Sequence, residues 1–347
     1  MDRHNNFDAL RLVAATSVIF SHAFLLGGGT QDPEPLMRLT GGQTVLGVVG
    51  VFVFFTISGF LVTQSFEATG SPFRFAVKRV LRIYPGLLAC LLLTAFAIGP
   101  FVSDLSAAAY FGNASVYTYV SSNFTMVMPA NALPGVQFSG YGAGSVVDGP
   151  LWTLPCEVAM YLMVLGLGVL RWLDLRVMLA LIIAGMIGIW FDTAASDYFV
   201  GSALWLLPLF AAGTALYRLR DRGIFRGRIA LAALAGLVLS VPLHAFILLF
   251  PIFGSYLVIY VALERRLPFV NAARFGDLSY GLYIYGWPVE QVLVRLNGGT
   301  MAWPELFGFA FPITAACAFA SWHLIESRAL RLKPANAARV AGRLAVP

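Results

Sequence analysis

Apolar runs long enough to cross a bilayer recur from one end of this chain to the other. A transmembrane helix needs about 20 predominantly apolar residues. No hydrophilic segment between the runs is long enough to form a separate soluble domain. Only 12% of the residues are charged, whereas soluble domains carry about 25% charged residues. The sequence therefore predicts an all-α integral membrane protein with about ten transmembrane helices.

The predicted spans define one membrane domain, residues 1–333, followed by a short basic tail, residues 334–347. Pro242, His244 and Pro251 interrupt the seventh and eighth spans, and that region could instead be one span and a broken hairpin. The ten spans lie at roughly 8–27, 44–65, 83–102, 151–170, 177–193, 199–217, 229–244, 247–263, 277–295 and 304–325.

Lys and Arg gather in alternate connections between these spans, and this asymmetry predicts the orientation. With the N-terminus in the cytoplasm, twenty of the 23 basic residues lie on the inner side. The exceptions are Arg11 in the first span, Arg38 outside and Arg295 near an outer end. We therefore expect both termini in the cytoplasm, a multi-pass location in the inner (plasma) membrane, and contacts with the bilayer rather than with nucleic acid.

The three cysteines, Cys90, Cys156 and Cys317, lie in apolar runs without paired spacing. Neither a disulfide framework nor a metal site is predicted. The longest connection, residues 103–150, lies on the outer side and is rich in Gly, Ser, Asn and aromatic residues. It could be a folded cap that stacks on a sugar-like or lipid-like substrate, or an interfacial aromatic belt. Its aromatic residues are Tyr110, Phe111, Tyr117, Tyr119, Phe124, Phe138 and Tyr141.

The first predicted span carries three ionisable residues: Asp8, Arg11 and His22. Arg11 and His22 are eleven residues apart, which on a helix is within about 20° of three whole turns and a rise of roughly 16 Å. Ionisable side chains inside a membrane helix are costly and usually face a cavity or a partner. A neutral imidazole can accept a proton from a hydroxyl near neutral pH, and Arg11 could clamp a phosphate or thioester donor. Alternatively, His22 only hydrogen-bonds a neighbouring helix, and Asp8 and Arg11 form an anchoring ion pair.

Two further sites could carry chemistry. Arg79 and Arg82, three residues apart, would share a helix face just inside the membrane and could bind the phosphates of a nucleotide-type donor. Positive-inside charge alone also explains basic residues there.

Glu157 opens the fourth span, at an expected depth similar to that of His22. It could orient the imidazole or bind an acceptor hydroxyl, or be a helix-start acid favoured by the helix dipole. Trp152 is either a sugar-stacking platform or an interface anchor.

The ninth span begins with Asp277 and Ser279, which we expect to cap the helix. Gly281 and Gly286 would allow close helix packing. Glu290 could face a cavity, but we interpret it as a packing residue.

Several motifs in this order resemble the integral-membrane acyltransferase 3 family. They are Arg11 and His22 in FDALRLVAATSVIFSH at 7–22, GVFVFFTISGFL at 50–61, Arg79 and Arg82 followed by IYP at 83–85, LWTLPCE at 151–157 and SYGLY at 279–283. The resemblance covers essentially the whole chain. It implies acyl-CoA, such as acetyl-CoA, as co-substrate rather than a bound cofactor, a glycan or lipid-linked saccharide as acceptor, and a catalytic role for His22. It also implies importance for Arg11, Arg79, Arg82 and Glu157.

We therefore expect an O-acyltransferase of the carbohydrate O-acetylase type. His22, Glu157 and Arg11 would be catalytic, Arg79, Arg82 and Arg11 would bind the donor, and Trp152 and Glu157 would bind the acceptor. The basic donor residues fall on the inner side, and His22 and Glu157 fall on the outer side, so the acyl group would cross the bilayer within the protein.

The chain departs from the family pattern at Gly286, where several relatives have a histidine. Some relatives also carry a C-terminal soluble domain, and without one we expect transfer to finish in the membrane domain or with a partner. A homodimer would fit the glycine-rich helices as well as a monomer. The competing interpretation is a transporter or flippase for a glycan or lipid intermediate, in which the ionisable residues line a path. Inverted repeats, which would favour that interpretation, are not evident in the sequence.

Overall fold

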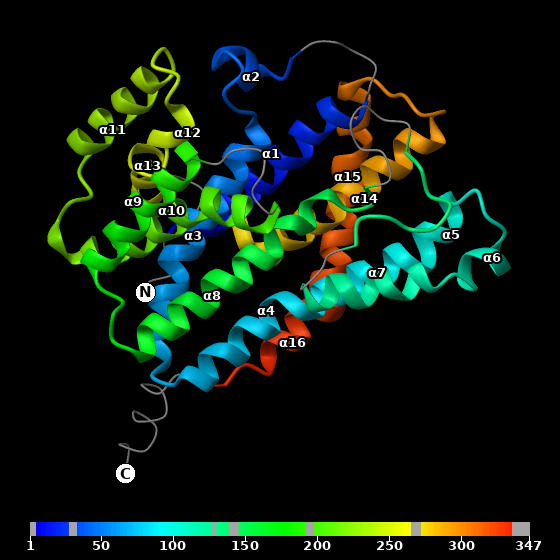
Figure 1. Ribbon diagram of the computed structural model, residues 1–347, viewed down its shortest axis with the longest axis horizontal. Helices are drawn as coiled ribbons and strands as arrows, with labels where there is room; N and C mark the ends of the chain where they lie inside the picture. Colours follow the sequence, from blue (N-terminus) through cyan, green and yellow to red (C-terminus); the bar gives the residue numbers. More distant parts are fainter. Residues whose placement is uncertain are drawn as a thin grey trace.

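The computed structural model describes residues 5–27, 33–126, 130–138, 146–191, 198–264 and 272–334, and within these ranges it contains helices and connections but no strand. Six helical stretches are long and apolar enough to cross a membrane. They are built from α1 (Phe7–Gly27), α3 (Leu46–Thr69), α4 (Pro72–Leu93), α8 (Thr153–Val169), α10 (Tyr198–Leu219) and α15 (Trp303–Ser321). The protein is therefore an all-helical, multi-pass membrane protein (Figure 1).

The remaining predicted spans are occupied by shorter or more polar helices. These are α9 (Leu175–Phe191), α11 (Gly227–Ser240), α12 (Phe246–Leu249), α13 (Phe253–Leu263) and α14 (Ser279–Leu296). The predicted interruption is present, because α11 ends at Ser240 and only the four-residue α12 precedes α13. A helix thus lies in every predicted range, while the count of ten crossings and the cytoplasmic termini stay predictions.

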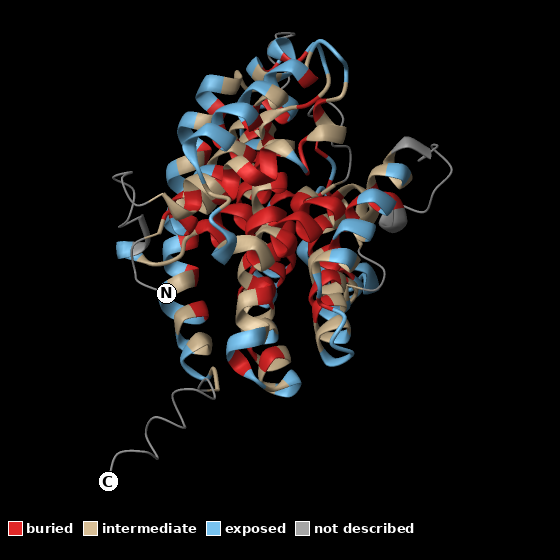
Figure 2. Ribbon diagram, turned by 90° about the vertical axis from the view of Figure 1, so that its left-hand side faces the viewer, coloured by how far each residue is buried: buried red, intermediate tan, exposed pale blue. Residues whose placement is uncertain are grey.

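Helix α3 lies at the centre of the bundle, between α1 and α10. Helix α3 packs so closely against α10 that a Cβ atom on Gly59 would lie 2.0 Å from the carbonyl oxygen of Phe210. A Cβ atom on Gly213 of α10 would lie 2.0 Å from the carbonyl oxygen of Thr56. Small residues let membrane helices approach in this way. Figure 2 shows the resulting core, with buried residues gathered in the middle of the molecule.

Helices α14 and α15 close the other side of α1. Two long helices end in a π-helical turn: α4 continues through Thr94–Ile98 into α5 (Gly99–Val102), and α15 continues through Trp322–Glu326 into α16 (Ser327–Arg331). Such turns are rare and often mark functional sites. The second one matters here because it brings the C-terminal segment against α4.

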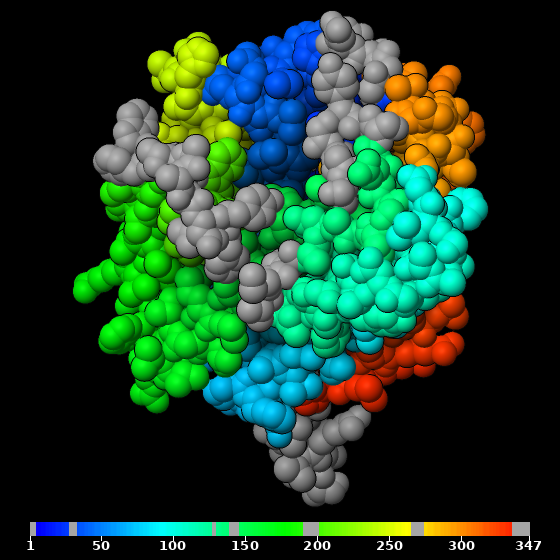
Figure 3. Space-filling model, turned by 45° about the vertical axis from the view of Figure 1, so that its right-hand side comes forward, coloured from blue at the N-terminus to red at the C-terminus, as the bar shows by residue number. Residues whose placement is uncertain are grey.

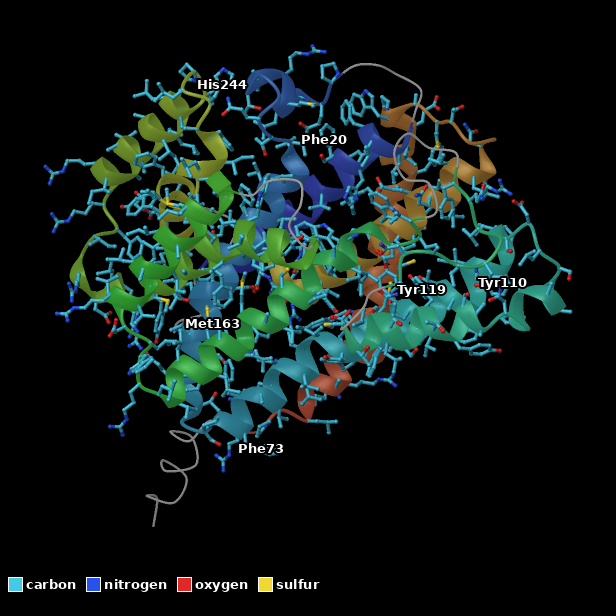
Figure 4. The ribbon with its side chains drawn as sticks, viewed as in Figure 1. Phe20, Phe73, Tyr110, Tyr119, Met163 and His244 are labelled. Carbon is cyan, nitrogen blue, oxygen red and sulfur yellow. The ribbon has the colours of Figure 1, made fainter. Side chains whose placement is uncertain are left out.

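The connection predicted to lie outside, residues 103–150 (the outer connection), contains two helices in its described part, α6 (Ala107–Phe111) and α7 (Ala114–Thr125). Figure 4 labels two of its aromatic residues, Tyr110 and Tyr119, and both are fully buried. The hydroxyl of Tyr110 donates a hydrogen bond to the carbonyl of Ala95 at 2.8 Å. These rings fasten the connection to the helices, so they are neither a substrate platform nor an interfacial belt. Phe111 and Tyr117 remain exposed, and Tyr141 lies outside the described residues.

Candidate active site

A cavity of about 290 Å³ opens among α1, α3, α4, α8, α14 and the C-terminal segment, Trp322–Lys333. Four cationic side chains and two acidic ones line it: Arg11, Arg79, Arg82 and Lys333, with Glu157 and Asp277. The sequence predicted that Arg11, Arg79 and Arg82 belong to one site, and the structure brings them together with Glu157. It adds Asp277 and Lys333, which had not been assigned to the site. The cavity therefore carries an excess of positive charge suited to an anion.

Asp277 holds two of the arginines. Its Oδ2 accepts from Arg11 Nη1 at 2.8 Å and from Arg82 Nη2 at 2.6 Å. Burial by itself raises the pKa of Asp277, but Arg11 and Arg82 outweigh it and hold the pKa well below its usual range. Asp277 was expected to cap α14, yet the cap of that helix is Leu278 and has no side-chain hydrogen bond. The partner of Arg11 is thus Asp277 of a distant segment, not Asp8 of its own helix.

Arg79 lies between two aromatic rings. Its guanidinium carbon is 5.6 Å from the centroid of Phe75 and 5.5 Å from that of Tyr161. Its Nη2 donates to Ser65 Oγ at 3.2 Å, while its buried Nε has no hydrogen-bond partner among the described residues. The carboxylate of Glu157 accepts a hydrogen bond from Tyr161. Arg79 therefore keeps donor capacity directed at the cavity.

His22 does not line this cavity. Its Nδ1 lies 3.5 Å from Oε2 of Glu290, a side chain with no exposed surface. Neither Glu290 oxygen has a hydrogen-bond partner among the described residues. The ring packs edge-on against Trp287, with centroids 4.8 Å apart. Glu157, which the sequence placed at a similar depth and assigned to orienting His22 or binding the acceptor, lines the basic cavity instead. The carboxylate next to His22 is that of Glu290.

An aromatic layer separates the basic cavity from His22. Phe54 and Tyr283 line the cavity, with ring centroids 5.6 Å apart. Trp287 follows Tyr283 by one turn of α14, and Glu290 follows Tyr283 by seven residues, a rise of roughly 10 Å. The structure therefore contains two polar centres in sequence along α14: a basic one near Asp277 and a His–Glu pair deeper in the bundle.

The departure at Gly286 has a steric reason. A Cβ atom there would lie 2.9 Å from Cγ1 of Ile19, a fully buried residue of α1. With Ile19 on α1, a side chain at position 286 would force Ile19 or one of the two helices to shift. Ile19 precedes His22 by three residues and Gly286 precedes Glu290 by four, so the close contact lies one turn from the His–Glu pair. In this chain the position serves helix packing beside the site.

Trp152, expected at the acceptor site, is half-buried and packs against the main hydrophobic core. The next residue, Thr153, shares a 2.8 Å hydrogen bond with the hydroxyl of cavity-lining Tyr283. Glu290 and Asp277 were missed because each was given a local role, packing or capping. An acid inside an otherwise apolar helix was the signal for Glu290. The described residues contain no cluster of three or more His, Cys, Asp or Glu that could hold a metal ion.

Comparisons with known proteins identify the family of this chain. The acyltransferase domain family matches residues 4–323. An O-acetyl transferase of Shigella phage Sf6 is 30% identical over 347 aligned residues, which cover 95% of this chain and 97% of the relative. Nodulation protein 10 of Rhizobium leguminosarum bv. viciae is 29% identical over 370 residues, which cover 96% of this chain and 95% of the relative. No solved structure matches. The chain therefore belongs to the acyltransferase 3 family and is an O-acyltransferase.

Proposed function

We propose that the protein transfers an acyl group, in the first instance acetyl, from acyl-CoA to a hydroxyl of a surface or exported polysaccharide or a lipid-linked sugar. The observation that carries this proposal is the basic cavity, in which four cations face only two acids. Coenzyme A is a polyanion with a phosphate-rich head and a slender thioester arm. The name of the phage relative, an O-acetyl transferase, supports acetyl as the group transferred.

The donor head would be held by Arg79 and Arg82. A guanidinium can form paired, charge-assisted hydrogen bonds with a phosphate. Arg82 and Arg11 are held in place by Asp277 while keeping further N–H groups. Glu157 contacts Tyr161, so we assign it to shaping the donor cavity beside Arg79 rather than to orienting His22. The thioester arm would then extend past Phe54 and Tyr283 towards His22.

His22 would act as the general base. If Nδ1 carries the proton directed at Glu290, Nε2 is left free to accept a proton from the acceptor hydroxyl. The hydroxyl oxygen then bonds to the thioester carbonyl carbon, the carbon–sulfur bond breaks, and His22 returns the proton to the departing thiolate. The products are an O-acyl sugar and free coenzyme A. Burial of Glu290 supports its role as the group that orients the imidazole.

The acceptor would reach His22 from the outer side of the inner membrane. Basic residues of α4 and α10 meet at the end of α3, at one end of the bundle. Arg218 of α10 pairs with Glu67 of α3. Thr69, two residues after Glu67, accepts a hydrogen bond from Lys78 of α4. Arg295 pairs with Asp104 of the outer connection. This separation supports entry of donor from the cytoplasm and of acceptor from outside, with the acyl group crossing between them.

The test is release of coenzyme A thiol by the purified protein with acetyl-CoA and a panel of surface glycans. His22→Ala should lower the rate by about 10²–10⁴-fold, the usual contribution of a general base. The matched control is His244→Ala, a histidine between α11 and α12, which should keep the wild-type rate. Equal rates for wild type and His22→Ala would remove His22 from catalysis. If the wild type releases no thiol and binds no acyl-CoA, the proposed donor is wrong and the result favours the transporter interpretation.

A further inference from the structure

The fourth cation of the basic cavity, Lys333, comes from outside the region shared with the family. The family match ends at residue 323, ten residues before Lys333. Lys333 nevertheless lines the same cavity as Arg79 and Arg82. Two other residues of the C-terminal segment, Trp322 and Leu330, line it as well. This segment, Trp322–Lys333, therefore forms a wall of the cavity.

The C-terminal segment is fixed in place by its π-helical turn. Glu326, only 2% exposed, accepts a hydrogen bond from Ser321 Oγ at 2.9 Å. Its carboxyl carbon would lie 3.3 Å from a Cβ atom built on Gly86 of α4. Trp322 packs against the backbone of Gly276, next to Asp277. Figure 3 shows the C-terminal helices, in red, lying against the light-blue first part of α4. Lys333 thus follows directly on a segment that packs against α4 and Gly276.

The electrostatic setting of Lys333 favours an anion. Burial, and after it the neighbouring Arg82, Arg79 and Lys78, together lower the pKa of its ammonium group to about 8, although Asp277 acts in the opposite direction. Among the described residues, no side chain hydrogen-bonds or ion-pairs with this ammonium group. Gathering like charges costs free energy, which an anion bound between them would offset. A polyanionic ligand fits this requirement better than a neutral one.

We propose that Lys333 is a donor-binding residue that contacts a phosphate of the 3′-phospho-ADP head of acyl-CoA at the mouth of the basic cavity. This inference rests on the proposed use of acyl-CoA. Lys333 would act as a point charge beside the planar guanidinium groups of Arg79 and Arg82. The C-terminal segment would thereby complete the donor site, while the acyl group and the chemistry at His22 lie at the other end of the thioester arm.

The experiment compares two donors, acetyl-CoA and acetylpantetheine, which carries the same thioester without the phospho-ADP head. A hydrogen bond to a charged group contributes about 1.5–3 kcal/mol, so Lys333→Ala should raise the KM for acetyl-CoA about tenfold or more with kcat unchanged. The KM for acetylpantetheine should stay at the wild-type value. Lys333→Arg should restore most of the affinity for acetyl-CoA. The matched control is Arg328→Ala, an exposed cation of α16 outside the cavity, which should change neither constant.

An unchanged KM for acetyl-CoA in Lys333→Ala would overturn the inference, as would an equal rise for both donors. If Lys333 binds the phosphate of a lipid headgroup instead, the KM for acetyl-CoA stays at the wild-type value, and stabilisation by anionic phospholipid is lost in Lys333→Ala. Activity of the wild type with acetyl-CoA separates this failure from failure of the proposed function. A wild type that uses neither donor would overturn both.

Discussion

At the scale of single residues, the proposed proton transfer depends on the pairing of His22 with Glu290. Oε2 of Glu290 is 3.5 Å from Nδ1, and neither carboxylate oxygen has a hydrogen-bond partner among the described residues. An imidazole that donates from one nitrogen presents the other as an acceptor. The pair therefore has the components of a general base and its orienting group, a combination that recurs on unrelated folds.

Glu290→Gln keeps the shape of the side chain and removes its charge. We expect kcat to fall by about 10²-fold, within the range for general-base catalysis, while KM for the donor and the unfolding temperature change little. The measurement is steady-state thiol release beside thermal unfolding in detergent. Glu305→Gln, an exposed acid in the first turn of α15, serves as the control. A Glu290→Gln enzyme with the wild-type kcat would show that Glu290 has no part in catalysis.

Asp277→Asn removes the carboxylate shared by Arg11 and Arg82. All three side chains are less than one-fifth exposed, and breaking a buried ion pair costs about 3–5 kcal/mol. We expect a loss of about 2–3 kcal/mol of unfolding free energy, because the cavity admits water. Since its pKa is lowered from 3.8, the stabilisation is fully present above that value and is lost progressively as the pH falls from there through the lower pKa of the folded state.

Unfolding of Asp277→Asn in detergent, followed at pH 7 and at pH 3, checks both statements. The control is Asp104→Asn, whose partner Arg295 is exposed, and such surface pairs contribute about 0–1 kcal/mol. If Asp277→Asn unfolds at the wild-type temperature at pH 7, Asp277 does not hold the two arginines.

At the scale of helices, the contact between α1 and α14 positions the His–Glu pair. Gly286→Ala would place Cβ 2.9 Å from Ile19 Cγ1, and overpacking of a core typically costs about 1–3 kcal/mol. We expect a lower unfolding temperature and a lower kcat, because the strain lies one turn from both His22 and Glu290. Differential scanning fluorimetry and thiol release measure the two effects.

A double-mutant cycle shows whether Ile19 is the cause. Gly286→Ala combined with Ile19→Ala should be more stable than the sum of the single changes predicts. Gly308→Ala on α15, where nothing lies within 4 Å of the added Cβ atom, should be neutral or slightly stabilising. Strictly additive effects of Gly286→Ala and Ile19→Ala would refute the close contact.

The sequence predicts where the helices lie better than it predicts which helices are in contact. The length of the apolar runs predicted a helix in every range where the structure has one. Helical spacing placed Arg79 and Arg82 on one face, and both line the cavity. Periodicity fixes the face of a helix on which a residue lies, but not which helix that face meets. Arg11 and Asp277 are 266 residues apart, and His22 meets Glu290 from an equally distant helix. For this reason the sequence paired Arg11 with Asp8 and assigned Asp277 to capping, whereas the structure pairs Arg11 with Asp277.

At the scale of the whole molecule, the account requires the two ends of the bundle to face opposite sides of the membrane. Arg222 lies in the turn after α10, and Ser115 lies in α7 of the outer connection; both are exposed. With half-buried Cys317 replaced by serine, Ser115→Cys should react with an impermeant maleimide on intact cells. Arg222→Cys should react only after permeabilisation. The reverse pattern would contradict the predicted orientation.

The division of labour between the basic cavity and the His22–Glu290 pair is tested most directly by equilibrium binding of acetyl-CoA. The account predicts that purified His22→Ala binds acetyl-CoA as tightly as the wild type does, although it cannot transfer the acetyl group. Arg79→Ala should bind at least tenfold more weakly, because a charge-assisted contact with phosphate is lost. Tight binding by Arg79→Ala, or loss of binding in His22→Ala, would contradict a donor site in the cavity that is separate from the catalytic histidine.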